Sequence, residues 1–150
     1  DDSILSGASA NVGTLNITVS GTVYDHASPI YAGGTLILPN VRDDYKVSVL
    51  STGSLEVLNA AGLRVNLKSV ATSSGSVSVG SLAGLAQGGT GYFGAVLAQG
   101  RPAGLVSEVL TLTFGDDSTL NGGSANVGTG TVTVLGGIYR MASGSLTQNG

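Results

Sequence analysis

DDSILSGASANVGTLNITVSGTVY, the stretch formed by residues 1–24, occurs again in the same chain as DDSTLNGGSANVGTGTVTVLGGIY, residues 116–139. The two copies align without a gap at a constant offset of 115 residues, and 15 of the 24 positions are identical. Chance does not produce such a match within 150 residues, so the chain contains an internal repeat. It therefore holds one full period together with a second copy of one edge of that period.

The length of the period bears on the domain organisation. Solenoid repeats run about 20–50 residues, whereas a period of 115 residues matches the size of a sandwich domain. We expect residues 25–139 to form one β-sandwich module and residues 140–150 to be a connector or tail. Residues 1–24 are then a further copy of the closing loop and strand of the module, that is, a surplus or linking strand.

The composition excludes several classes of protein. Apolar residues make up 41% of the chain and the net charge is −3, which argues against disorder. Six Lys and Arg residues are too few for a nucleic-acid-binding surface, and no apolar run is long enough to span a membrane. The chain has no cysteine and only 10% charged residues, against about a quarter in ordinary soluble proteins. A surface rich in Gly, Ser and Thr suggests an extracellular setting.

Short runs of β-branched and apolar residues, separated by Gly, Asn, Asp and Ser, predict strands throughout the chain. Leu15, Ile17 and Val19 alternate with polar residues, which is typical of a strand with one buried face. The second copy, Gly130–Tyr139, and the segment Leu105–Phe114 are also predicted strands. No segment has the period of a helix. We therefore expect an all-β fold, an antiparallel immunoglobulin-like (Greek-key) β-sandwich of roughly eight to ten strands.

Several segments carry a family resemblance. They are GTVYDHASP at 21–29, GGTLILPNV at 33–41, SLEVLNAAGLRVNLK at 54–68, GLAQGGTG at 84–91 and the repeated DDSxLxGxSANVGT loop. Together they resemble bacterial tandem-repeat surface proteins of the choice-of-anchor D type, whose modules are similar to immunoglobulin-like sandwiches of the abnormal-spindle/hydin class. The resemblance implies a bacterial extracellular or cell-surface protein built from consecutive modules. It implies no catalytic residues.

Adjacent carboxylates in both copies are candidates for a cation site. Asp1 and Asp2, and likewise Asp116 and Asp117, lie in glycine-rich loops that suit the oxygen preference of Ca²⁺. Calcium loops normally carry acids at several alternating positions, so turn formation by Asp is the favoured interpretation. We expect no cofactor, with Ca²⁺ at these four residues as the alternative.

A catalytic role is not expected. His26 is the single histidine, and Asp25 and Ser28 beside it provide the residue types of a triad. A triad is defined by spatial geometry, however, and Arg140–Met141 replace Asp25–His26 after the second copy. We interpret His26 as a surface loop residue and predict that the protein is not an enzyme.

The repeated strand indicates a structural role. A surplus strand can pair with an open sheet edge of a neighbour, and head-to-tail contacts of this kind build filaments. We expect a non-enzymatic extracellular structural protein, a module or subunit of a cell-surface fibre, whose partners are copies of itself or neighbouring modules. The residues expected to carry this self-association are Leu15, Ile17, Val19, Val23, Tyr24, Val132, Val134, Ile138 and Tyr139.

An adhesin or ligand-binding module is the alternative function. Two loops are its candidate contact surfaces, the glycine-rich residues 82–91, which we expect to be an irregular connection, and the acidic turn at residues 40–44.

Overall fold

The computed structural model describes residues 6–7 and 13–145. None of these residues forms a helix, so no membrane-crossing helix is found among them. The strands are β1 (Pro29–Ile30), β2 (Gly34–Ile37), β3 (Val41–Arg42), β4 (Val49–Leu50), β5 (Leu55–Asn59), β6 (Asn66–Val70), β7 (Thr72–Ser73), β8 (Val77–Val79), β9 (Thr90–Phe93), β10 (Ala95–Leu97), β11 (Gly104–Asp117) and β12 (Gly128–Tyr139).

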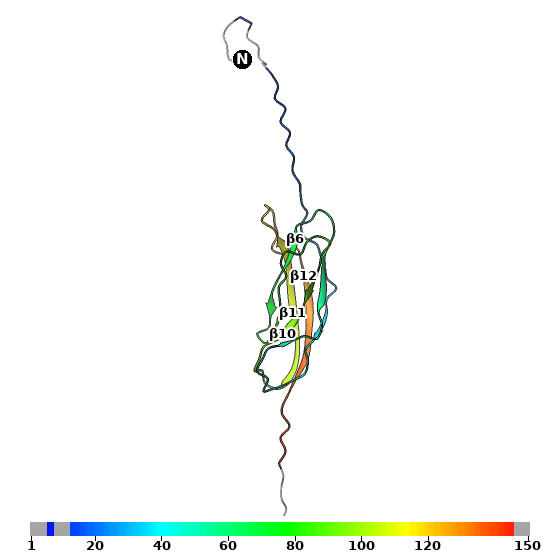
Figure 1. Cartoon of the computed structure of the whole chain (residues 1–150), viewed down its shortest axis with the longest axis vertical. Helices are drawn as coiled ribbons and strands as arrows, with labels where there is room; N and C mark the ends of the chain where they lie inside the picture. Colours follow the sequence, from blue (N-terminus) through cyan, green and yellow to red (C-terminus); the bar gives the residue numbers. More distant parts are fainter. Residues whose placement is uncertain (1–5, 8–12, 146–150) are drawn as a thin grey trace, which may run out of the picture.

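The two longest strands, β11 and β12, form an antiparallel hairpin at the centre of the largest sheet. Their register runs from Gly104 opposite Ile138 to Phe114 opposite Gly128. β6 pairs with the last residues of β11, and β2 and β3 pair with the outer side of β12. The hairpin runs along the long axis of the molecule (Figure 1).

β2 and β3 run parallel to β12, which differs from the purely antiparallel sandwich that was expected. The reason is topological. Pro29, which begins β1, lies at the end of the body where β12 begins, since Pro29 packs near Gly128. β2 therefore starts from that end and follows β12 toward the other end of the molecule.

Two smaller sheets make up the opposing layer. One has the order β1-β5-β9 and the other the order β4-β10-β8-β7. β9 and β10 follow each other directly across Gly94, so the two sheets continue into one another. All pairings within this layer are antiparallel.

Buried apolar side chains from both layers meet in one core because inward and outward residues alternate along each strand. Three rings, those of Tyr31, Phe93 and Phe114, pack with centroids 5.7–6.2 Å apart. The largest fully buried side chains are Phe93, Phe114, Leu36, Leu38, Leu67, Leu97, Leu112, Val57, Val77, Val79, Val132 and Val134.

The expected all-β sandwich is confirmed. The number of strands is higher than eight to ten because four of them, β1, β3, β4 and β7, are two-residue segments. Two of the loops expected from the sequence contain strand residues. Val41–Arg42 of the 40–44 turn forms β3, and Thr90 of the glycine-rich 82–91 segment begins β9.

Candidate functional site at the junction of arm and body

Residues 13–24, called the arm below, extend away from the sandwich (Figure 1). No backbone hydrogen bond joins residues 14–24 to any other residue that the structure describes. Leu15, Ile17, Val19 and Val23 are 77–89% exposed, and Tyr24 is 46% exposed. The predicted first strand is therefore extended, but it has no ladder partner within the part of the chain that the structure describes.

The second copy of the repeat has the opposite environment. Val132 and Val134, the counterparts of Ile17 and Val19, are fully buried in β12, and Ile138 is nearly so. Tyr139 is 53% exposed, much as Tyr24 is. The same apolar pattern thus forms part of a core in one copy and is exposed to water in the other.

The chain enters the body, which we define as residues 25–139, through a short segment that is held on both sides. The N–H of Asp25 donates to Leu63 O at 2.8 Å, and its carbonyl accepts from Val65 N–H at 3.0 Å. The carbonyl of Ser28 accepts from Ala60 N–H at 2.9 Å, and the carbonyl of His26 accepts from the Arg64 guanidinium at 3.0 Å. These bonds attach the base of the arm to the body on both sides.

Asp116 is the central residue of this junction. Its carboxylate is buried and accepts three hydrogen bonds, from Ala27 N–H at 2.8 Å, from Ser124 N–H at 2.8 Å and from His26 Nδ1 at 2.5 Å. Because a carboxylate accepts, the histidine proton lies on Nδ1. Burial by itself raises the pKa of Asp116, but the bonds from Ser124, His26 and Ala27 outweigh burial, and the pKa is lowered.

The loop between β11 and β12 is built around this carboxylate. Ser124 accepts from Asp116 N–H through its carbonyl, and its hydroxyl bonds with the backbone of Asn126. The side chain of Asn126 then accepts from Gly128 N–H. Gly115 is required, since a Cβ there would lie 2.6 Å from Ala125 O. These contacts explain why a Ser-Ala-Asn-Val-Gly-Thr run belongs to the closing element.

Asn59 is a second buried polar residue at the same end. Its side-chain oxygen accepts from Ser28 N–H at 3.0 Å, and its nitrogen donates to Val65 O and Leu85 O at 3.1 Å. One side chain therefore ties together three segments. All polar atoms of buried side chains in the described residues have a partner.

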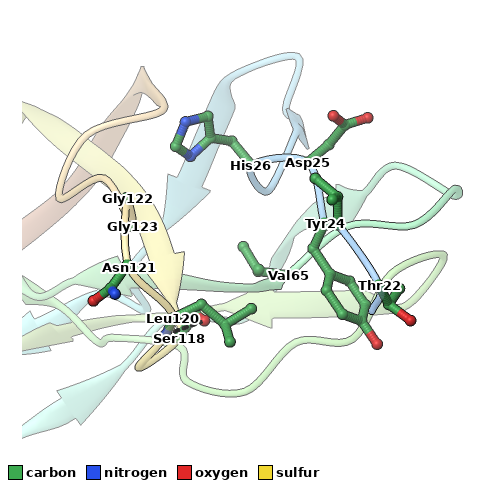
Figure 2. Close-up of a pocket in the computed structure, with 11 residues that line it drawn as sticks. Thr22, Tyr24, Asp25, His26, Val65, Ser118, Leu120, Asn121, Gly122 and Gly123 are labelled. Carbon is green, nitrogen blue, oxygen red and sulfur yellow. Dashed lines mark hydrogen bonds between the residues drawn. The ribbon is translucent and has the colours of Figure 1, made fainter. Parts of the chain in front are cut away.

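A hollow of about 270 Å³ lies between the base of the arm and the loop after Asp117. Figure 2 shows the ring of Tyr24 on one side and Leu120 on the other, with Val65 between the two segments. Both Tyr24 and Leu120 are about half exposed. The hollow is thus a small, partly apolar surface beside the point where the arm leaves the body.

The acidic candidates of the second copy both accept hydrogen bonds from the protein. The Asp116 carboxylate accepts from His26 Nδ1, Ala27 N–H and Ser124 N–H, and the carboxylate of Asp117 accepts from Gly84 N–H at 2.6 Å. Within residues 6–7 and 13–145, no three His, Asp or Glu side chains are grouped as metal ligands. Asp1 and Asp2 lie outside the described residues.

His26 is exposed and lies outside the strands, as expected of a surface loop residue, but its ring also has a distant partner. It pairs with Asp116, 90 residues away, instead of with its neighbour Asp25. Sequence reasoning missed this pair, and it also missed Asn59. One signal was present in the sequence, which is that Asp116 occurs in both copies of the repeat. A repeated acid beside an uncharged loop is expected to have hydrogen-bond donors near it in the folded protein.

The two loops considered for ligand binding do not form a common surface. The 82–91 segment is attached to Asp117 and to β6, at the arm end of the hairpin. In the 40–44 turn, Asp43 N–H donates to Tyr139 O, at the opposite end of the hairpin.

Comparison of the sequence with models of known protein families and with curated proteins found no match in either case. The fold and the junction themselves define a class, namely an all-β sandwich with extended segments leaving its two opposite ends (Figure 1).

Proposed function

We propose that this protein is a module of an extracellular structural array in which successive sandwiches are joined head to tail through the repeated strand. In this array, residues 1–24 close the preceding module as residues 116–139 close this one. The proposal makes the chain a non-enzymatic component of a bacterial cell-surface fibre, as the resemblance to tandem-repeat surface proteins implies. Its low charge and lack of cysteine agree with that setting.

The distribution of identities within the repeat carries the proposal. Residues 1–14 match residues 116–129 at 11 of 14 positions, whereas residues 15–24 match residues 130–139 at 4 of 10. In the second copy, the more conserved part is the acid and the loop built around it. Donation of a strand alone needs no such loop. A complete closing element needs the acid, the loop and the strand together.

The exposed arm supports the same proposal. Each fully buried Val, Leu or Ile side chain stabilises a fold by about 1.5–3 kcal/mol relative to leaving it in water. The arm leaves four such side chains exposed on one short segment. A preceding body would cover them as this body covers Val132, Val134 and Ile138.

The shape of the molecule also favours an array. The arm leaves one end of the long axis and residues 140–145 leave the other (Figure 1). Modules joined through these segments follow one another in a line.

An extended chain tests the proposal. It consists of residues 25–115 placed directly before residue 1 of the 150-residue chain, so that the arm can close the added sandwich. We expect chymotrypsin, which cleaves after Leu and Tyr, to cut the arm more slowly in an extended chain whose added sandwich accepts the arm, that is, in the unchanged extended chain or in one of its two variants described below, than in the 150-residue chain. The proposal is contradicted if the arm is cut as fast as in the 150-residue chain in all three proteins, namely the extended chain and its two variants described below.

A further inference from the structure

Two glycines of β12 lie where large side chains of neighbouring segments come close to the strand. A Cβ on Gly136 would lie 2.8 Å from Leu38 Cβ, and one on Gly130 would lie 2.2 Å from the Tyr31 ring. Distances below 3.0 Å do not occur for real Cβ atoms, so both positions require glycine in this body. The packing of β12 therefore depends on glycine at the two positions that face Leu38 and Tyr31.

The arm keeps one of these glycines and loses the other. Gly21 stands in the place of Gly136, and Leu15 stands in the place of Gly130. A strand with Leu15 in the β12 position of this body would place a Cβ 2.2 Å from the ring of Tyr31 and would have three more side-chain carbons to accommodate. In the position of β12, the arm would therefore leave room for Leu38 but would clash with Tyr31.

Tyr31 cannot move aside at little cost. Its ring packs against Phe93 at 6.1 Å and against Phe114 at 5.7 Å, and its hydroxyl donates to Thr131 O at 3.1 Å. Burial also raises the pKa of Tyr31, whose side chain is partly buried against the core. Because these three contacts hold the Tyr31 ring, it cannot turn away to make room for Leu15 without losing some of them.

A second observation concerns the next period. At the same offset of 115, Ala27 and Ser28 align with Ala142 and Ser143, and Tyr31 aligns with Leu146. The residue at the Tyr31 position therefore differs between periods of this protein, and leucine is smaller than tyrosine.

From these contacts we infer that the partner of the arm is a sibling module with a small side chain in place of Tyr31 and a bulky apolar one in place of Leu38, and not a second copy of this chain. The inference rests on the proposed function, because it describes the module that residues 1–24 close. Neighbouring modules in the array are then matched in pairs and are not interchangeable.

The extended chain and two variants test the inference. One variant carries Tyr31→Ala in the added segment, and the other carries Leu15→Gly in the arm. We expect amide hydrogens of residues 15–22 to exchange at least tenfold more slowly in each variant than in the unchanged extended chain. The two variants relieve the clash from opposite sides, so a folding defect in one leaves the other informative.

A matched control places Tyr31→Ala in the second body instead. Gly130 faces that position, so the substitution opens a cavity, and we expect a lower thermal midpoint with no change in exchange of the arm. Equal protection of the arm in the unchanged extended chain and in both variants overturns the inference and leaves the proposed function intact. Absence of protection in all three chains contradicts both.

Discussion

The imidazole of His26 lies 2.5 Å from the carboxylate of Asp116, although 90 residues separate them in the chain. His26 belongs to the segment that enters the body, and Asp116 belongs to the last part of β11. Their contact, with that of Ala27, closes the sandwich at the end where the arm leaves. The side chain of His26 is 59% exposed, whereas that of Asp116 is 1% exposed. The stabilisation of this end of the body therefore depends mainly on the Asp116 carboxylate.

The stability of the body should fall in acid because of Asp116. Its pKa is lowered from the ordinary value of 3.8, so the unfolded chain binds this proton more tightly than the folded protein does. The stabilisation is complete well above pH 3.8 and is lost as the pH falls through the folded pKa. Urea unfolding between about pH 5 and about pH 2 measures this loss.

Asp116→Asn is the matching variant. An amide can keep the bond from Ala27 N–H but leaves the partly buried Ser124 N–H without an acceptor, which costs about 1–3 kcal/mol at neutral pH. We also expect a flatter dependence of stability on pH below 4 (roughly the titration range of Asp). Asp117→Asn is the control, because Asp117 is less buried and accepts a single bond. An Asp116→Asn protein as stable as the wild type would show that the hydrogen bonds to the Asp116 carboxylate are dispensable.

Asn59→Ala should destabilise the body by about 3 kcal/mol, since it removes partners from one N–H and two carbonyls at a buried site. Thermal or urea unfolding of the full chain measures the change. Ser51→Ala, which removes the acceptor of the Ala95 N–H and the donor to Gly53 O at a less buried position, is expected to cost about 1 kcal/mol. Similar values for both variants would contradict a special role for Asn59.

Deletion of residues 1–24 should leave the free energy of unfolding within about 0.5 kcal/mol of the full chain, because residues 14–24 bond to nothing else that the structure describes. The deletion should also reduce self-association at high concentration, since it removes exposed apolar side chains. Sedimentation velocity compares the two chains. Replacement of Leu15, Ile17 and Val19 by Ser is the control that keeps the length of the arm. Self-association that is unchanged in both proteins would exclude the arm as its cause.

Tension between the two ends of the body should meet high resistance. β2 and β12 run parallel over four residue pairs, and a pull on Asp25 and Tyr139 in opposite directions shears these bonds together. Single-molecule pulling measures the rupture force, and each body should release about 40 nm of chain (115 residues at about 3.6 Å each).

The control pulls the same body in another direction. The chain has no cysteine, so cysteines introduced at Arg101 and Arg140 provide unique handles. These residues flank the Gly104–Ile138 end of the hairpin, and force applied there peels β11 from β12 one bond at a time. We expect a clearly lower rupture force in this geometry. Equal forces in the two geometries would rule out shear between β2 and β12 as the source of resistance.

Much of the fold could be predicted from local patterns. Alternation along Gly130–Tyr139 and Leu105–Phe114 predicted the two strands that form the central hairpin, because a sheet with one buried face needs that period. The parallel pairing of β2 with β12 could not be predicted, since alternation is the same for either direction of a neighbour. The junction was hidden for a related reason. His26 and Asn59 gain their roles from Asp116, Ser28 and Val65, which are distant in the chain.

The sequence by itself determined that one closing element occurs twice, because identity at a fixed offset requires no coordinates. It also determined the all-β class, since the alternation of apolar residues is a local property of each segment. Tertiary structure alone decided that the apolar residues of β12 are buried and those of the arm exposed, that the Asp116 carboxylate joins the entering segment to the last loop, and that the Tyr31 ring lies where a side chain on Gly130 would be. These outcomes depend on which distant side chains meet in three dimensions, and packing of that kind leaves no local pattern in a single chain.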